Sequence, residues 1–261
     1  MTTPSPTVFP AAWQPRQDIE LVRVGPHEDG GYVIGAAALA RTKRLVSGGL
    51  FDDWRFEESF QARTDCEVDC YDPSVTAKFW VKRYYAYARA IAAGQSKPRD
   101  LTRYFEFKKF FDGRRNRHHR AYLTYSTWGT DLRTALGSDA GASTFLKIDI
   151  EGSEYRVLAD IIARQEAISG FVIEFHDVDL HIERISQFIM DAAPWFYVEH
   201  LHINNYGAMA PNGLPSAIEM SFGRVDQAIP RDCDAVPQPY PLVGLDVPNN
   251  PAAADIAFTF A

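Results

Sequence analysis

Residues 143–165 read STFLKIDIEGSEYRVLADIIARQ. The first eight of these residues form a dense apolar run of the length of a buried strand. Residues 153–165 then show the 3.6-residue periodicity of an amphipathic helix. Its apolar face would consist of Tyr155, Leu158, Ile161 and Ile162. A buried strand that leads directly into such a helix is the repeating unit of an α/β protein.

The same alternation continues on both sides of this segment. Upstream, the pattern predicts strands at 43–49 and 66–73 around a helix at 52–63. Downstream, it predicts a helix at 180–193 and strands at 170–176, 195–203, 216–222 and 254–260. Strands this apolar, separated by helices, predict a mainly parallel sheet that helices cover on both faces.

The N-terminal residues do not follow this rhythm. Residues 1–20 are Pro-rich and weakly patterned, which suggests a surface arm. Residues 21–35 consist of two apolar runs around Gly30-Gly31, and this pattern predicts a hairpin. We therefore expect an N-terminal arm and hairpin, residues 1–40, that pack on the core.

A second interruption lies inside the predicted core domain, residues 41–261. Residues 75–125 are rich in basic and aromatic side chains, and we interpret them as an insertion or a helical cover, with one further strand at 120–126. Arg or His occupies six of the seven positions from Arg114 to Arg120. This cluster is either a solvated loop or a contact for an anionic substrate, because Arg and His suit phosphate and carboxylate.

Composition excludes several classes of protein. The 261 residues include 27 Lys and Arg against 34 Asp and Glu, and the net charge of −7 argues against non-specific binding to nucleic acid or membrane. No apolar run is long enough to span a membrane, and the N-terminus lacks the pattern of a signal peptide, so a cytoplasmic location is expected. Cys66, Cys70 and Cys233 are too few for a disulfide scaffold, and burial as small hydrophobic side chains is expected. The sequence carries no signal of oligomeric state.

Ligands of open α/β sheets bind at the carboxyl ends of the strands. The strand at 43–49 ends in Ser47-Gly48-Gly49, followed by Asp52, and small residues there let a ligand approach the backbone and the helix N-terminus. The next strand ends in Asp72, 23 residues after Gly49, where an acid can bind the hydroxyls of a ribose. A tight turn and a solvated acid are the alternatives, but together the two signals favour a nucleoside cofactor.

Titratable groups also end the two following strands. Asp149 and Glu151 share a face if their strand continues that far, and so do Glu174 and His176. Carboxylates beside an imidazole can tune a general base or hold a hard divalent cation. The alternative is structural salt bridging, for example with Lys147.

A third polar set follows at the end of the strand at 195–203. It consists of His200, His202, Asn204 and Asn205. These residues form either a wall of a substrate pocket or a satisfied structural cluster.

These segments resemble a known family. The stretch KIDIEGSEYRVL, residues 147–158, resembles the signature of FkbM-type methyltransferases, which are S-adenosylmethionine-dependent enzymes with a class I Rossmann-like fold. Further similar patches, in order, are RVGPHEDGGYVI, SGGLFDDWRFEESF, YDPS, VIEFHDVD, LHINNYG, LPSAIEMSF and LDVPNNP. The resemblance covers residues 21–260 in patches, and KIDIEGSEY is its most specific part.

The resemblance implies methyl transfer to an oxygen of a sugar, a polyketide or another small secondary metabolite. It implies that Asp72 binds the ribose and that Asp149 lies near the methyl group. The methionine and adenosine end of the cofactor would be lined by Ser47, Gly48, Gly49 and Asp52. It also suggests that Arg23 and the Asp29-Gly30-Gly31 turn close over the cofactor.

The mechanism must remove a proton from the acceptor hydroxyl. His176 is the leading candidate base, oriented by Glu174 or Asp149, with Glu151 in the same acid cluster. If a divalent metal is present, Asp149, Glu174 and His176 would be its ligands and His202 would be the base. The alternatives are an NAD(P)-dependent oxidoreductase, although the chain lacks GxGxxG, and a non-catalytic nucleoside-binding module. The predicted partner is a small-molecule acceptor, with no nucleic acid.

Overall fold

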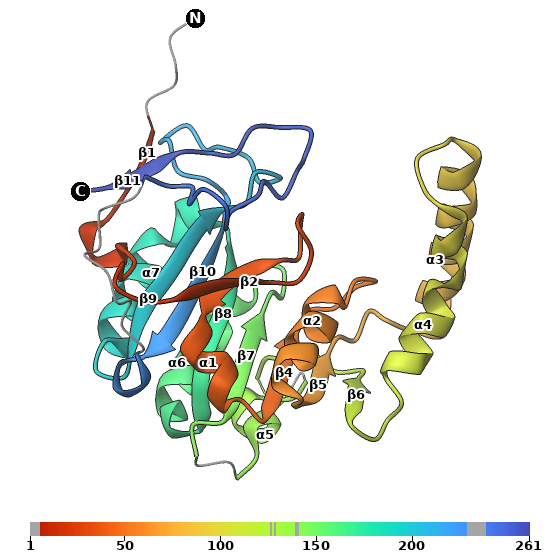
Figure 1. The fold of residues 1–261 in the computed structure, drawn as a ribbon, viewed down its shortest axis with the longest axis horizontal. Coiled ribbons are helices and arrows are strands. Elements are labelled where there is room, and N and C mark those ends of the chain that lie inside the picture. The colour runs from red at the N-terminus through yellow and green to blue at the C-terminus, as the bar shows by residue number, and fades with distance from the viewer. Residues whose placement is uncertain (1–5, 126, 128, 139–140, 229–238) are drawn as a thin grey trace, which may run out of the picture.

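A computed structural model of the protein describes residues 6–125, 127, 129–138, 141–228 and 239–261. Its centre is a seven-stranded sheet with the order β6-β5-β4-β7-β8-β10-β9 (Figure 1). The strands are β4 (Arg44–Gly48), β5 (Glu67–Tyr71), β6 (Asn116–His119), β7 (Thr144–Ile148), β8 (Ile168–His176), β9 (Phe196–Ile203) and β10 (Ala217–Arg224).

Neighbouring strands from β6 to β8 are parallel, and β10 alone runs antiparallel, between β8 and β9. Counted from β4, the first five strands have the order 3-2-1-4-5 of dinucleotide-binding sheets. The chain leaves β4 toward β5 on one side, and β7 joins β4 on the other. The carboxyl ends of β4 and β7 therefore form the topological switch point, where ligands of such sheets bind.

Helices cover both faces, as predicted. One face carries α1 (Ala36–Arg41), α2 (Arg55–Thr64) and a hairpin of β2 (Leu21–Val24) and β3 (Tyr32–Gly35). The other carries α5 (Leu132–Leu136), α6 (Leu158–Ala163) and α7 (Val178–Ala192). The predicted hairpin is confirmed, and β2 crosses in front of the sheet in Figure 1.

Several predicted boundaries are wrong. The strand expected at 120–126 is instead β6, just upstream, because this edge strand is polar and gives no apolar signal. The strand expected at 143–150 ends at Ile148. The helix expected at 153–165 is a 3₁₀ turn, Glu154–Arg156, followed by α6 and a second 3₁₀ turn. The helix expected at 52–63 begins only at Arg55.

The two ends of the chain pair with each other. β1 (Thr7–Phe9) lies parallel to β11 (Phe258–Phe260), and a 3₁₀ turn, Ala11–Trp13, follows β1. Phe9 and Trp13 are buried, so this part of the expected surface arm belongs to the core. Large aromatic side chains bury a large apolar area, which explains why a weakly patterned segment packs into the core.

The predicted insertion is helical. It consists of α3 (Ala77–Ala92), a 3₁₀ turn (Pro98–Thr102) and α4 (Arg103–Phe110), and it stands beside the sheet rather than over one face (Figure 1). Cys66 and Cys70 are buried as expected, whereas Cys233 lies outside the described residues. Among the described residues, no helix is both long and apolar enough to cross a membrane.

Candidate functional site

The backbone passes unusually close to itself at the switch point. Gly49 follows β4 with a φ of +81°, and a Cβ at this position would lie 1.6 Å from the carbonyl oxygen of Asp149. Only glycine fits there, and its absent side chain lets the loop after β4 pack directly against the backbone at Asp149. Gly48 is similarly tight, because a Cβ would approach Ile150 to 3.0 Å.

Asp72 fixes the loop that follows Gly49. One oxygen of its buried carboxylate accepts hydrogen bonds from the backbone N–H groups of Leu50 (3.0 Å) and Phe51 (2.8 Å). The other oxygen accepts the N–H of Ser74 (2.7 Å), and the Ser74 side chain also hydrogen-bonds to this carboxylate. Burial alone would raise the pKa of Asp72, but these hydrogen bonds outweigh it and hold the pKa below its usual value.

The two other polar residues of the predicted cofactor loop point elsewhere. The Ser47 hydroxyl donates to the buried carboxylate of Glu57 at 2.6 Å. Asp52 accepts from Tyr87 and pairs with Arg83, both on α3. The structure therefore brings Gly48, Gly49 and Asp72 together at the switch point but turns the side chains of Ser47 and Asp52 away from it.

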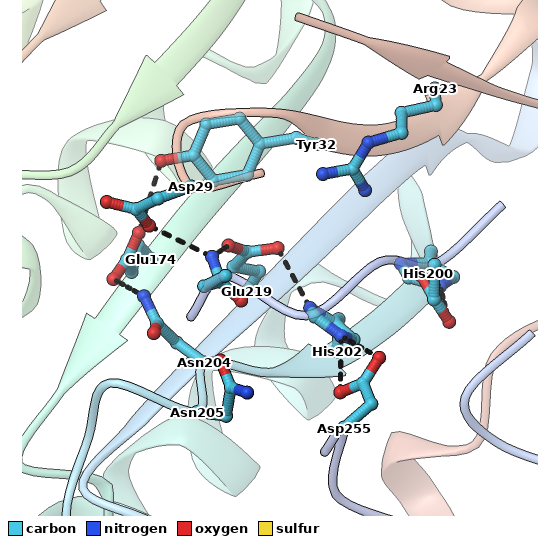
Figure 2. A network of polar contacts seen from close by, with 12 residues as sticks. Arg23, Asp29, Tyr32, Glu174, His200, His202, Asn204, Asn205, Glu219 and Asp255 are labelled. Atoms are coloured by element: carbon cyan, nitrogen blue, oxygen red, sulfur yellow. Dashed lines mark hydrogen bonds and ion pairs between the residues drawn. The ribbon is translucent and has the colours of Figure 1, made fainter. Parts of the chain in front are cut away.

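A row of ionisable side chains crosses the sheet under the hairpin. In the strand register, Glu219 of β10 stands opposite Glu174 of β8 and opposite His202 of β9. Asp149, one residue beyond β7, continues the row past Glu174. Tyr32 reaches this row from β3 (Figure 2), and its hydroxyl lies 3.1 Å from Glu174 and 3.3 Å from Asp149.

Two further side chains donate hydrogen bonds to the acids of this row. Lys147 is buried, and its ammonium group donates to Asp149 at 3.0 Å and to the carbonyl of Gly49 at 2.9 Å. Asn204 donates to Glu174 at 2.7 Å. Burial, together with the charges of Asp149 and Glu219, nevertheless raises the pKa of Glu174 well above its usual value.

His176 lies at the end of β8 among carboxylates. Its Nδ1 is 3.1 Å from Glu154, and its Nε2 is 3.6 Å from Glu151 and 3.8 Å from Glu174. Burial would lower the pKa of His176, but the hydrogen bond with Glu154 and the surrounding charges raise it to about 9. The carboxylates around it therefore favour the protonated imidazole, which must release its proton before it can bind a metal ion or act as a base.

Glu151 takes a different position from the one predicted. Because β7 ends at Ile148, Glu151 lies in a turn with a φ of +53°, and its side chain is 87% exposed. It still comes close to the predicted partners, since one ligand atom each from Asp149, Glu151 and His176 lie within 4.8 Å of one another. Carboxylates and an imidazole in such a group can hold a divalent cation.

Glu154 is a site residue that the sequence reasoning missed. It is fully buried, and one carboxylate oxygen accepts the N–H groups of Ile150 (2.9 Å) and Gly152 (3.2 Å) while it contacts His176. It thus shapes the turn that carries Glu151. The only signal in the sequence is an acid two residues after a glycine at a strand–helix junction.

His202 is not open to a substrate. It is buried, with Nδ1 3.3 Å from Glu219 and Nε2 3.0 Å from both oxygens of Asp255 (Figure 2). Burial would lower the pKa of His202, but these carboxylates raise it to about 10. His200 pairs in the same way with Asp246 at 3.0 Å. The geometry favours a structural cation here over the predicted base.

Hydrogen bonds connect the β2–β3 hairpin to the C-terminal segment, residues 239–261, above the row of ionisable side chains. The guanidinium of Arg23 donates to the carbonyl oxygens of Pro26, Glu28 and Leu245. Asp29 accepts from Asn249 at 3.0 Å, and Asn249 also donates to Glu219 at 2.6 Å. Arg23 and Asp29 therefore hold the cover of the site in place through protein contacts. Asn205 anchors the same segment, because its side chain accepts the N–H of Asn250 at 2.6 Å.

The central part of the basic cluster from Arg114 to Arg120 is neither the solvated loop nor the anionic-substrate contact that the sequence allowed. It forms β6, where Arg117 and His119 bind the buried carboxylate of Asp69. Arg115 pairs with Asp65. These side chains hold an edge strand on the sheet.

No family model matches the chain, and no curated protein matches it. Among solved structures, it is similar to the 23S rRNA methyltransferase ErmE, with a TM-score of 0.41 and 10% identity over 74% of this chain and 66% of that one. It is also similar to spermidine synthase from Thermotoga maritima, with a TM-score of 0.41 and 11% identity over 77% of this chain and 64% of that one. A third similar structure is geranyl diphosphate C-methyltransferase from Streptomyces coelicolor A3(2), with a TM-score of 0.36 and 11% identity over 71% of this chain and 75% of that one. The match spans less than two thirds of the length of the first two. With TM-scores below 0.5 at these identities, the likenesses carry no argument about family or substrate.

The strand order by itself shows a Rossmann-like α/β fold, with a mainly parallel sheet and helices on both faces.

Proposed function

We propose that the protein is an S-adenosylmethionine-dependent O-methyltransferase of the FkbM type, which acts on a hydroxyl of a small acceptor such as a sugar or a polyketide. One observation carries the proposal. At the switch point, the side-chain-free Gly49, the anchored loop after it and Asp72 stand next to Asp149, where the acid row begins. A nucleoside site and a proton-handling site thus adjoin.

The cofactor fits the residues present. Gly48 and Gly49 let the loop after β4 pack closely against Asp149 and Ile150, and the Asp72 carboxylate orders this loop at the switch point, where a ribose would bind. When bound, S-adenosylmethionine supplies an electrophilic methyl group. The protein must then hold the acceptor oxygen in line with that methyl group and favour its deprotonated form.

The acid cluster supports a divalent cation as the means of deprotonation. Three carboxylates, Asp149, Glu151 and Glu154, lie around Lys147 and His176, so a negative surplus remains even without Glu174. One ligand atom each of Asp149, Glu151 and His176 lie within 4.8 Å of one another, so this set replaces the predicted one that contained Glu174. Such a cation lowers the pKa of a hydroxyl that binds it.

Calorimetric titration with S-adenosylhomocysteine, with and without Mg²⁺ or Mn²⁺, tests both parts. Micromolar binding supports the cofactor class, while binding of NADH instead would favour an oxidoreductase. For the cation, Glu151→Gln should weaken Mg²⁺ binding at least about tenfold. The matched variant Glu183→Gln, at an exposed position on α7, should leave it unchanged.

Two results would overturn the proposal. Folded protein that binds no S-adenosylhomocysteine under any of these conditions would remove the methyltransferase. Methyl transfer that persists in a metal chelator, together with equal Mg²⁺ affinity of both glutamine variants, would remove the cation and return His176 to its predicted role as the base.

A further inference from the structure

The charge of this protein is divided between two parts of the molecule. Residues 77–110, which form α3, α4 and their connection and are called the arm below, contain nine Lys and Arg against two Asp and Glu. The arm therefore carries +7, and the rest of a chain of −7 carries −14. In Figure 1 the arm stands apart from the sheet, so the positive charge is presented on a separate body.

Most cations of the arm have no acidic partner. Arg83 and Arg103 pair with Asp52 and Asp53 at the base of the arm. Within the described part of the chain, the other seven are exposed and form no salt bridge. They are Lys78, Lys82, Arg89, Lys97, Arg99, Lys108 and Lys109. Unpaired cations that gather on one body are the electrostatic footprint of a polyanion site.

Aromatic side chains accompany these cations. Trp80 and Phe107 are buried and pack on Trp54, with ring centroids 6.5 and 5.8 Å away, and they fix the arm to the core. Four others remain in solvent, namely Tyr84, Tyr85, Tyr104 and Phe105, which are 52%, 63%, 42% and 70% exposed. Exposed aromatic rings cost hydrophobic free energy unless a ligand covers them.

One face of α3 combines both kinds of side chain. Lys78, Lys82, Tyr85 and Arg89 follow one another at intervals of four, three and four residues, so they form a stripe along the helix. A hollow of about 810 Å³ lies on this face, lined by Lys82, Tyr85, Arg89 and neighbouring alanines. Tyr85 is 63% exposed beside this hollow, so its ring is accessible to a ligand.

We propose that the arm binds single-stranded nucleic acid. Cationic side chains that pair with phosphates, together with aromatic rings on which bases stack, are the usual components of such sites. A membrane surface fits less well, because interfacial helices separate apolar and charged faces, whereas on α4 Tyr104 and Phe105 share the outer surface with Lys108 and Lys109. The overall acidity that argued against nucleic acid does not apply to the arm, and the proposal is independent of methyl transfer.

Fluorescence anisotropy of the intact protein tests it. The probes are fluorescein-labelled 15-nucleotide oligouridylate and oligothymidylate, titrated between 50 and 200 mM salt. Each phosphate contact adds about −0.7 to the slope of log K against log salt, so the double variant Lys82→Glu/Arg89→Glu should flatten the slope by about 1.4 and weaken binding at least about tenfold. Tyr85→Ala should weaken binding at least about fivefold through lost stacking.

The matched control makes the same charge change elsewhere. Arg41 and Lys43 are exposed at the opposite end of the sheet, and Arg41→Glu/Lys43→Glu should alter affinity less than about threefold. Equal losses in both double variants would show a non-specific charge effect and overturn the proposal. So would binding to vesicles of anionic phospholipid with none to either oligonucleotide at 50 mM salt. Circular dichroism confirms that each variant remains folded.

Discussion

Replacing Asp72 separates two roles that its position allows. In Asp72→Ala, the backbone N–H groups of Leu50, Phe51 and Ser74 all lose their acceptor. Phe51 and Ser74 are exposed enough for water to take over, but Leu50 is 4% exposed. The hydrogen bond from Leu50 to a charged group is therefore lost without replacement, and the free energy of unfolding should fall by about 1.5–3 kcal/mol.

Thermal unfolding makes this loss measurable. In a chain of this size, about 1 kcal/mol corresponds to roughly 2–4 °C, so Tm should fall by about 3–12 °C. Asp72→Asn should lose less, because its amide oxygen can still accept from Leu50 and Phe51 and only the N–H of Ser74 then faces an NH₂ group. Asp191→Ala, an exposed acid on α7, is the control and should leave Tm unchanged.

Cofactor affinity distinguishes anchoring from ribose binding. The asparagine variant keeps the loop but presents an NH₂ group where the second carboxylate oxygen stood, so it should bind S-adenosylhomocysteine about 10–150-fold more weakly. Unchanged affinity in Asp72→Asn would refute the ribose role. Unchanged Tm in Asp72→Ala would refute the loop-anchoring role.

Three other replacements test buried groups near the site or in the sheet. Burial raises the pKa of Glu199 to about 7, although the N–H of Gly35 donates to its carboxylate. The folded form therefore holds a proton that the unfolded form releases, and stability falls as pH rises from about 4.5 to 7. Glu199→Gln should remove up to about 3 kcal/mol of this loss, so Tm should rise at pH 8 and change little at pH 4.5; an equal effect at both pH values would contradict the assignment. Burial would raise the pKa of Asp69, but Arg117 and the other cations hold this pKa well below its usual range. The stabilisation by Asp69 is therefore present at neutral pH and declines below pH 4. Asp69→Asn should lower the free energy of unfolding in urea by about 2–3 kcal/mol at pH 7, and a loss that persists undiminished at pH 2 would argue against the ion pairs. Tyr32→Phe removes only the hydroxyl that bridges two carboxylates. It should lower the rate of methyl transfer at least about tenfold, while the affinity for S-adenosylhomocysteine stays within about threefold. A parallel loss of affinity would instead place Tyr32 in the cofactor site.

The regular elements could be predicted because their burial leaves a local trace. β7 and β8 are buried on both faces and therefore appear as continuous apolar runs. β6 could not be predicted in this way, because its stability depends on Arg117 and His119 binding Asp69 rather than on apolar packing. An edge strand held by ion pairs looks like a charged loop in a sequence.

The site could be predicted in composition but not in arrangement. The strand ends at Asp149 and Glu174 follow from the apolar pattern, but the contact of both with Tyr32 joins residues more than 100 positions apart. The position of Glu151 depends on a positive φ in the turn, and that turn depends on the buried Glu154. No local sequence pattern reveals that a carboxylate accepts hydrogen bonds from the backbone of its own turn.

Charge shows why a quantity summed over the chain is a weak guide to binding. A net charge of −7 excludes a polyanion only if the charge is spread evenly, yet the fold gathers acids beneath the hairpin and cations on the arm. Electrostatic fields decay over about 10 Å at 0.1 M salt, so a ligand on the outer arm senses mainly the arm. The two surfaces should therefore act independently. Arm variants should leave Mg²⁺ affinity unchanged, and Glu151→Gln should leave oligonucleotide affinity unchanged. A measured coupling between them would mean that the bound ligands meet at the switch point, which would make the nucleic acid itself the candidate methyl acceptor.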